Sequence, residues 1–148
     1  MTRVFIDCHM FSEEWFKPIL MELTQSDKVL FLFSLNKIYS SEIQRSKKAL
    51  EFYKIIGKKR LVEADQETVD DHIGRLLSHE DFSSCSDCDD AHIFAMIWTK
   101  PTRYVFSMDA RMAKCRDKIN RSIESRYCDF IVISKRPTYD FHRLSIIT

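Results

Sequence analysis

The fold is decided by the stretch Arg3-Val4-Phe5-Ile6-Asp7, together with a second stretch far along the chain, Tyr104-Val105-Phe106-Ser107-Met108-Asp109. Each contains a short apolar run rich in β-branched and aromatic side chains, which is typical of a strand buried on both faces. An aspartate follows each run. In an open parallel sheet, ligands bind beyond the carboxyl ends of the strands, so both aspartates are expected at a binding edge.

Strand-like and helix-like segments alternate along the chain. Apolar runs predict strands at residues 3–7, 29–33, 60–62, 104–107 and 130–133, and the tail 139–147 is a candidate edge strand. Periodic apolar residues predict helices at 12–26, 38–56, 66–78, 90–98 and 110–125. Gly57 is expected to end the second helix in a left-handed conformation. The alternation predicts one α/β domain over residues 1–148, a three-layer α/β/α sandwich around a central, mostly parallel five-stranded sheet.

Composition excludes several classes of protein. The chain has 148 residues, of which 45% are apolar and 30% charged, as in ordinary globular domains. Its longest apolar runs are too short to cross a bilayer and no signal peptide precedes the first strand, so a cytoplasmic protein without membrane contact is expected. Only two glycines are present, which excludes the glycine-rich phosphate loops of P-loop and dinucleotide-binding proteins. A net charge of +1 limits nucleic-acid binding to a local basic patch.

The cysteines do not form a disulfide pattern that the sequence reveals. Five is an odd number, and the spacing is not that of a secreted disulfide scaffold, so reduced thiols are expected. The pair Cys85-x-x-Cys88 followed by His92 resembles part of a zinc site, but no second pair stands at matching spacing. The polar loop 83–89 that carries this pair is expected to be mobile and free of metal.

Four acidic residues fall where alternating strands and helices would bring them together: Asp7, Glu42, Asp90 and Asp109. Carboxylates that converge on one cleft repel one another unless cations lie between them, and hard oxygen ligands favour Mg²⁺ or Mn²⁺. The plainer alternative is that the aspartates cap helices and that the glutamate is an ordinary surface residue. If the four form a metal site, replacing Asp109 with Asn should leave the fold intact or slightly stabilised, because it relieves repulsion.

The ordered set of acids resembles the PIN domain, a family of metal-dependent nucleases. The matching motifs are Val4-Phe5-Ile6-Asp7, Tyr39-Ser40-Ser41-Glu42-Ile43, Asp90-Ala91-His92-Ile93-Phe94-Ala95 and Val105-Phe106-Ser107-Met108-Asp109, within residues 3–134. The resemblance implies an endoribonuclease whose four acids are both metal ligands and catalytic residues, with Ser107 bonded to an acid or a metal-bound water. It also implies a toxin or defence effector that forms homodimers and is inhibited by an antitoxin protein.

Basic residues follow two of the acids and are candidates for contacts with substrate phosphates: Arg45, Lys47, Lys48, Arg111 and Lys114. The alternative is that they form solvated faces. His9, just after Asp7, is a candidate for a contact with an acid or with substrate. Whether Asp89 or Asp117 adds a further acid to the site is left open by the sequence.

Two other functions remain to be weighed. A PIN-like module without catalysis would bind RNA or another protein and retain the fold. A phosphoacceptor receiver domain is suggested by Ser134-Lys135, but Asp65 is a weak acceptor candidate and Asp7-Cys8 is not an acidic pair. The RNA that is cut, the choice between RNA and DNA, and the number of metal ions cannot be read from the sequence.

Overall fold

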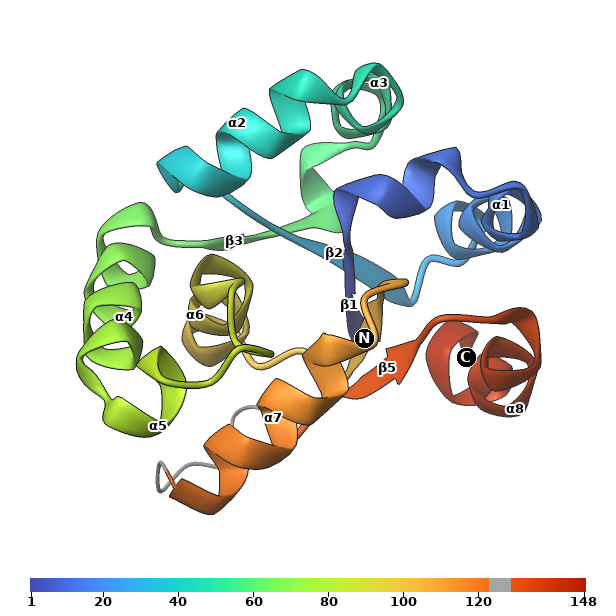
Figure 1. Ribbon diagram of the computed structural model, residues 1–148. Helices are drawn as coiled ribbons and strands as arrows, with labels where there is room; N and C mark the ends of the chain where they lie inside the picture. The colour runs from blue at the N-terminus through green and yellow to red at the C-terminus, as the bar shows by residue number, and fades with distance from the viewer. Residues whose placement is uncertain (123–128) are drawn as a thin grey trace.

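A parallel sheet with the strand order β3-β2-β1-β4-β5 forms the centre of the computed structural model, which describes residues 1–122 and 129–148 (Figure 1). In this described part of the chain the strands are β1 (Thr2–Ile6), β2 (Val29–Ser34), β3 (Leu61–Ala64), β4 (Tyr104–Phe106) and β5 (Ile131–Ile133). Every neighbouring pair is parallel. The predicted α/β class and five-stranded sheet are confirmed.

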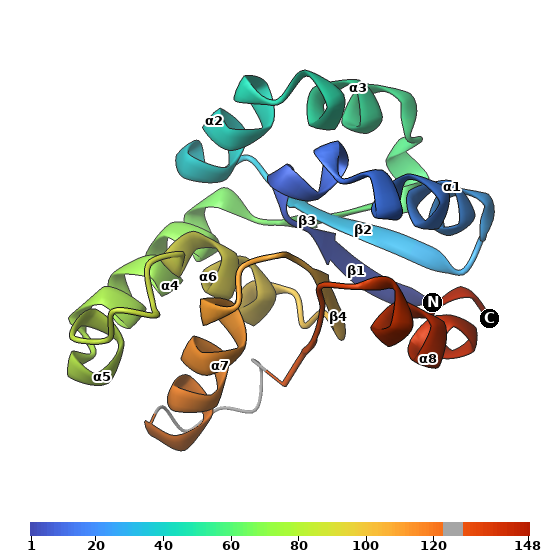
Figure 2. The same cartoon turned by 45° about the vertical axis from the view of Figure 1, so that its right-hand side comes forward.

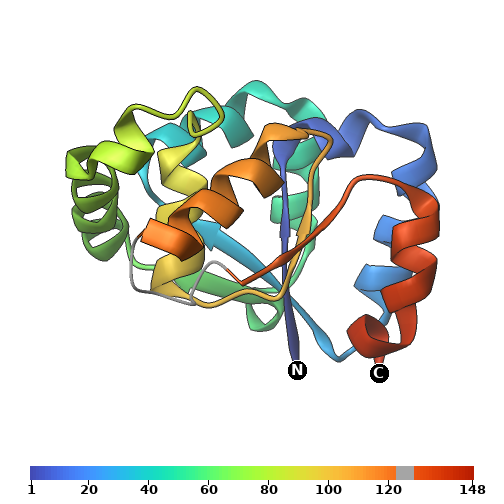
Figure 3. The same ribbon diagram turned by 60° about the horizontal axis from the view of Figure 1, so that its bottom comes forward.

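Helices cover both faces of the sheet, as the three-layer prediction requires (Figure 2). One face carries α4 (Gln66–Ser78), α5 (Glu80–Ser83), α6 (Ala91–Thr99) and α7 (Arg111–Ser122). The other carries α1 (Lys17–Gln25), α3 (Lys47–Ile55) and α8 (Arg136–Ile147), with α1 and α8 side by side in Figure 3. Helix α2 (Lys37–Arg45) contacts both α3 and α6, so it joins the two layers beyond the end of β2. Short 3-10 turns complete the chain: η1 (Cys8–Ser12), η2 (Glu14–Phe16) and η3 (Lys58–Arg60).

The alternation of side chains along β1 explains why both faces need helices. Val4 and Ile6 pack in the core beneath α1, α3 and α8, whereas Phe5 packs in the core beneath α4, α6 and α7. Successive side chains of a strand point to opposite faces, so a continuous apolar run supplies two cores. No helix in the described ranges 1–122 and 129–148 is long and apolar enough to span a membrane.

Several predicted boundaries were wrong. The tail is helix α8 rather than an edge strand, because Tyr139 and Ile146 are buried at a spacing of two helical turns. The predicted helix 38–56 is broken at Ser46, whose hydroxyl accepts a hydrogen bond from Ala49 N (3.2 Å) and begins α3. Gly57 has a φ of −66° and is not left-handed.

The first predicted helix, 12–26, begins later than expected. Two 3-10 turns precede α1, and Pro18 stands in its first turn, where the missing backbone N–H costs no hydrogen bond. The predicted helix 110–125 corresponds to α7, and its last residues, 123–125, lie outside the described part of the chain.

A disulfide joins Cys88 to Cys115, so the expectation of reduced cysteines was wrong for this pair. Cys115 is buried on α7, and the bond tethers the loop 83–89, which had been expected to be mobile, to that helix. Cys8 and Cys85 are free. Because the two bonded cysteines are 27 residues apart, the bond also constrains the unfolded chain.

Reduction of this disulfide should lower the free energy of unfolding by about 3.5 kcal/mol, the loop-closure value for a separation of 27 residues. Urea unfolding of the wild type with and without reductant measures the difference. The Cys88→Ala variant should be insensitive to reductant, and Cys85→Ala should respond like the wild type. Equal stability of the oxidised and reduced wild type would contradict the assignment of this bond.

Candidate active site

The four predicted acids lie at the carboxyl edge of the sheet. Asp7 directly follows β1, Asp109 follows β4, Glu42 lies on α2 beyond β2, and Asp90 directly precedes α6. The charges of Asp7 and Glu42 both raise the pKa of Asp90, so these three carboxylates lie within electrostatic range of one another. Residues distant in sequence are gathered because parallel strands deliver their carboxyl ends to the same edge.

A single serine ties the ends of the two central strands together. Ser107 Oγ donates a hydrogen bond to Asp7 Oδ2 (2.8 Å) and accepts one from the backbone N–H of Asp109 (3.1 Å). Burial raises the pKa of Asp7 above its ordinary value, although the Ser107 hydrogen bond and His9 oppose the shift. The predicted contact of Ser107 with an acid is confirmed.

His9 forms a second connection between the same two loops. Its Nε2 accepts a hydrogen bond from Met108 N (2.8 Å), and its Nδ1 lies 3.6 Å from Asp7 Oδ2. With Nε2 acting as acceptor, the ring proton of neutral His9 is on Nδ1, on the side that faces Asp7. His9 is therefore placed to hold this carboxylate in position, and it contacts an acid as predicted.

Glu42 is paired with a histidine that sequence reasoning considered only for zinc. Glu42 Oε1 lies against His92 Nε2, and the His92 side chain is 6% exposed. That nitrogen has no hydrogen-bond partner in the described structure, so the Glu42 carboxylate is the polar group beside it. The pairing holds Glu42 at the boundary between α2 and α6.

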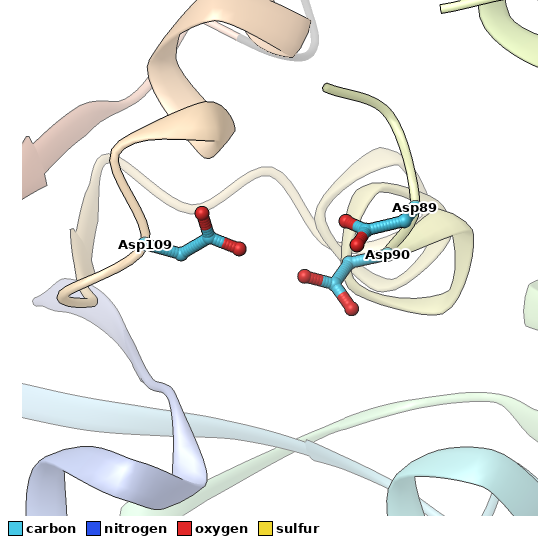
Figure 4. A group of neighbouring side chains, drawn as sticks. All are labelled: Asp89, Asp90 and Asp109. Atoms are coloured by element: carbon cyan, nitrogen blue, oxygen red, sulfur yellow. The ribbon is translucent and has the colours of Figure 1, made fainter. Parts of the chain in front are cut away.

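Asp89, Asp90 and Asp109 form the tightest acidic group, with carboxylate oxygens within 4.8 Å of one another. Figure 4 shows the carboxylate of Asp109, at the start of α7, facing those of Asp89 and Asp90 at the start of α6. Asp89, which the sequence left open as a further acid, thus lies beside Asp90 and Asp109. Asp117 does not belong to this group and instead pairs with Arg116 (2.9 Å).

Asp90 is the acid without a partner. Its side chain does not cap α6, and within residues 1–122 and 129–148 it forms neither a hydrogen bond nor a salt bridge. Burial, followed by the charge of Asp89, raises the pKa of Asp90 to about 6. A half-buried carboxylate that faces other carboxylates is a favourable position for a cation.

Arg111 neutralises the other two members of the group. Its Nε and Nη2 donate to the two oxygens of Asp109 (both 3.1 Å), and its Nη1 lies 2.8 Å from Asp89 Oδ2. The Arg111 hydrogen bond holds the pKa of Asp109 below its ordinary value. Arg111 had been predicted to contact substrate phosphate, and the structure places it on two acids instead. Relief of repulsion is therefore expected at Asp90 rather than at Asp109.

Three of the remaining basic residues gather beside the acids. Arg45, Lys47 and Lys48 line a pocket of about 440 Å³, whose wall also includes His9 and Glu42. Lys47 and Lys48 begin helix α3, so its unpaired N–H groups and positive dipole add to their charge. Lys114 is exposed on α7, outside this pocket.

The donor set fits a hard divalent cation and does not fit zinc. The group of three offers carboxylate oxygens, which suit Mg²⁺ and Mn²⁺. The zinc alternative was wrong, because Cys88 is bonded to Cys115 and His92 faces Glu42. Burial and the nearby carboxylates raise the pKa of Cys8 to about 12, so its thiol stays neutral and is a poor metal ligand.

No family model, no curated protein and no solved structure matches this chain. The resemblance to the PIN domain is therefore still a prediction.

Asp90→Asn should stabilise the metal-free protein at neutral pH. The pKa of Asp90 is about 6 when folded against 3.8 for the free group, so the folded state binds the proton more tightly. The free energy of unfolding of the wild type should therefore decrease as the pH rises from about 4 to about 6, and Asp90→Asn should avoid this decrease. Because the side chain is half-exposed, we expect a gain of only about 1 kcal/mol above pH 6.

Urea unfolding of both proteins across this pH range measures the gain. Asp27→Asn, at an exposed acid before β2, is the matched control for the loss of a surface carboxylate. A difference between Asp90→Asn and the wild type that stays constant from pH 4 to pH 7 would contradict the raised pKa.

Proposed function

We propose that the protein is a divalent-metal-dependent nuclease that hydrolyses RNA phosphodiester bonds with Mg²⁺ or Mn²⁺. The observation that carries this proposal is the group Asp89, Asp90 and Asp109, in which the half-buried Asp90 carboxylate has no hydrogen-bond or ion-pair partner among residues 1–122 and 129–148. The position of the group supports it further, since ligands of parallel sheets bind at the carboxyl edge.

Three of the acids would bind the metal ion, and the other two would add negative charge near it. Asp90 and Asp109, with Asp89 beside them, would hold a metal ion, and Asp7 and Glu42 would add negative charge from the sheet side. A divalent ion in such a site activates water for attack and neutralises charge on the phosphate. Ser107 and His9 fix the orientation of Asp7, and His92 fixes that of Glu42.

The adjoining pocket suits a nucleic-acid backbone, and RNA is proposed as the substrate from the resemblance to the PIN domain. Arg45, Lys47 and Lys48 would bind backbone phosphates on one side of the acids, where cations attract the chain without ligating a metal. The chain as a whole has a net charge of only +1, so this local patch would have to supply the attraction. Lys114, which is exposed on α7, would contact a phosphate outside this pocket.

The biological role is proposed from the resemblance to the PIN domain alone. It is that of a toxin or defence effector in the cytoplasm, forming homodimers and held inactive by an antitoxin protein. The Cys88–Cys115 disulfide weighs against a permanently reducing compartment, where such bonds are uncommon.

The competing candidate is a PIN-like module that binds RNA or protein without cleaving. One observation favours it, namely that Arg111 already neutralises Asp89 and Asp109. The receiver-domain alternative loses support, because Asp65 caps α4 by accepting from Thr68 N (3.0 Å). Metal-dependent cleavage of RNA separates the nuclease from both alternatives.

Asp90→Asn and Asp109→Asn should each reduce RNA cleavage at limiting Mg²⁺ by about a hundredfold or more, because each removes a charged oxygen ligand. The measurement is single-turnover cleavage of a labelled single-stranded RNA, with Mg²⁺ or Mn²⁺ and with chelator. Asp27→Asn should cleave like the wild type. Cleavage that persists in chelator, or at wild-type rates in both variants, would refute the metal mechanism, and RNA binding without cleavage would favour the inactive module.

Replacing Lys47 and Lys48 together with Ala should weaken RNA binding and leave cleavage at saturating RNA nearly unchanged. Each lost phosphate contact should flatten the log–log dependence of affinity on salt by about 0.7, so the double variant should lose about 1.4. Fluorescence anisotropy over a range of salt concentrations measures the slope, with Lys58→Ala and Lys59→Ala in η3 as the control pair. An unchanged slope would mean that the RNA follows another path.

A further inference from the structure

The guanidinium of Arg111 lies between two arms of the acidic group. It forms two hydrogen bonds to Asp109 (both 3.1 Å) and a salt bridge to Asp89 (2.8 Å). The two acids come from different segments, one before α6 and one before α7 (Figure 4). In the metal-free protein, Arg111 therefore supplies positive charge between the two segments, which the Cys88–Cys115 disulfide also joins.

These contacts use most of the acceptor capacity of Asp109. Oδ1 accepts from both the backbone N–H (3.0 Å) and Nε of Arg111, and Oδ2 accepts from Nη2. A carboxylate has about four lone-pair positions, so about one remains free. A divalent cation that uses both oxygens of Asp109 must displace the guanidinium, and the positive charge of Arg111 would also repel that cation.

The Arg111 side chain is partly open to water. It and the Asp89 side chain are each 49% exposed, so water competes for that ion pair, whereas the Asp109 side chain is 19% exposed and its pair with Arg111 is more sheltered. Exposed ion pairs contribute little to stability. Once released, a guanidinium at the rim of the site would retain its charge and its planar set of donors, which match a phosphate group.

We propose that Arg111 is the internal counter-ion of the acid site, displaced when a divalent cation binds and then free to contact substrate phosphate. The proposal rests on the proposed function, because it requires that the acids bind a metal. It also reconciles two roles of one residue, since the phosphate contact expected from the sequence and the acid contacts in the structure belong to different states.

Mn²⁺ titration followed by electron paramagnetic resonance of the free ion tests this directly. The proteins are the wild type, Arg111→Gln, Arg111→Lys and Arg136→Gln, the last removing an exposed arginine that pairs with Asp140 on α8. Arg111→Gln should bind Mn²⁺ about fivefold more tightly, the gain expected when weak competing ion pairs are removed. Arg111→Lys retains the charge but loses the forked geometry, and it should show most of that gain. Arg136→Gln should match the wild type.

The outcomes separate the two proposals. If the wild type binds Mn²⁺ and Arg111→Gln binds it equally or less tightly, the displacement model is wrong and the nuclease proposal stands. If Arg111→Lys behaves like the wild type while Arg111→Gln gains affinity, charge repulsion alone is responsible and displacement is again wrong. If neither the wild type nor Arg111→Gln binds Mn²⁺, both proposals fail.

A second measurement uses the wild type alone, so it does not depend on the folding of any variant. Addition of Mg²⁺ should shift the Nε–H resonance of Arg111 in the ¹H–¹⁵N spectrum, because its hydrogen bond to Asp109 is lost. The Nε–H resonance of Arg136 should not move. An unshifted Arg111 signal under saturating Mg²⁺ would overturn displacement.

Discussion

Repulsion among carboxylates gathered at one edge of the sheet is the constraint on which the rest of this structure depends. Parallel strands deliver Asp7 and Asp109 to the same edge, and two helices bring Glu42, Asp89 and Asp90 beside them. Nearly every carboxylate in this group has a polar or cationic neighbour. Ser107 and His9 contact Asp7, and His92 contacts Glu42. Arg111 contacts both Asp89 and Asp109. Asp90 is the exception among the described residues, and burial, followed by the charge of Asp89, raises its pKa to about 6. The fold therefore creates a local excess of negative charge at this edge of the sheet, and this excess is the basis for the proposed cation site.

Much of the fold could be predicted because it depends on local pattern. Apolar runs such as Val4 to Ile6 and Val29 to Phe33 indicate strands, since a parallel sheet must bury both faces. The tail 139–147 was predicted wrongly because its apolar residues suit either a strand or a helix. Only its packing decides, and Arg143 of α8 donates to Glu22 of α1 (2.7 and 2.9 Å), a residue 121 positions away in the sequence. The break at Ser46 depends similarly on a capping hydrogen bond that periodicity does not reveal.

The site was predictable in position but not in detail. The four acids were identified because an acid beside the carboxyl end of a strand has a defined place in a parallel sheet. Asp89 and Arg111 could not be assigned, because their roles depend on a contact between the loop before α6 and the start of α7 that no spacing encodes. The Cys88–Cys115 bond could not be predicted either, because disulfide connectivity cannot be deduced from sequence. The sequence did offer one indication that Arg111 contacts an acid, because Arg111 stands two residues after the candidate ligand Asp109.

The disulfide and the guanidinium act on the same pair of segments. Cys88 stands directly before Asp89, and Cys115 lies one turn beyond Arg111 on α7, so a covalent bond and an ion-pair network both span the gap. The covalent bond fixes the distance between the segments, whereas the exposed ion pairs can exchange. The disulfide would keep the two segments in place while the cation between them changes. Replacement of the Arg111 guanidinium by a metal ion requires such a fixed frame.

The most direct test of this account is anomalous diffraction from crystals of the wild-type protein grown with Mn²⁺. The account predicts an anomalous peak within direct coordination distance of the Asp90 and Asp109 carboxylates, with the Arg111 guanidinium moved away from Asp109. A peak elsewhere on the protein, or no peak with Arg111 still bridging Asp89 and Asp109, would contradict the claim that these acids form a metal site.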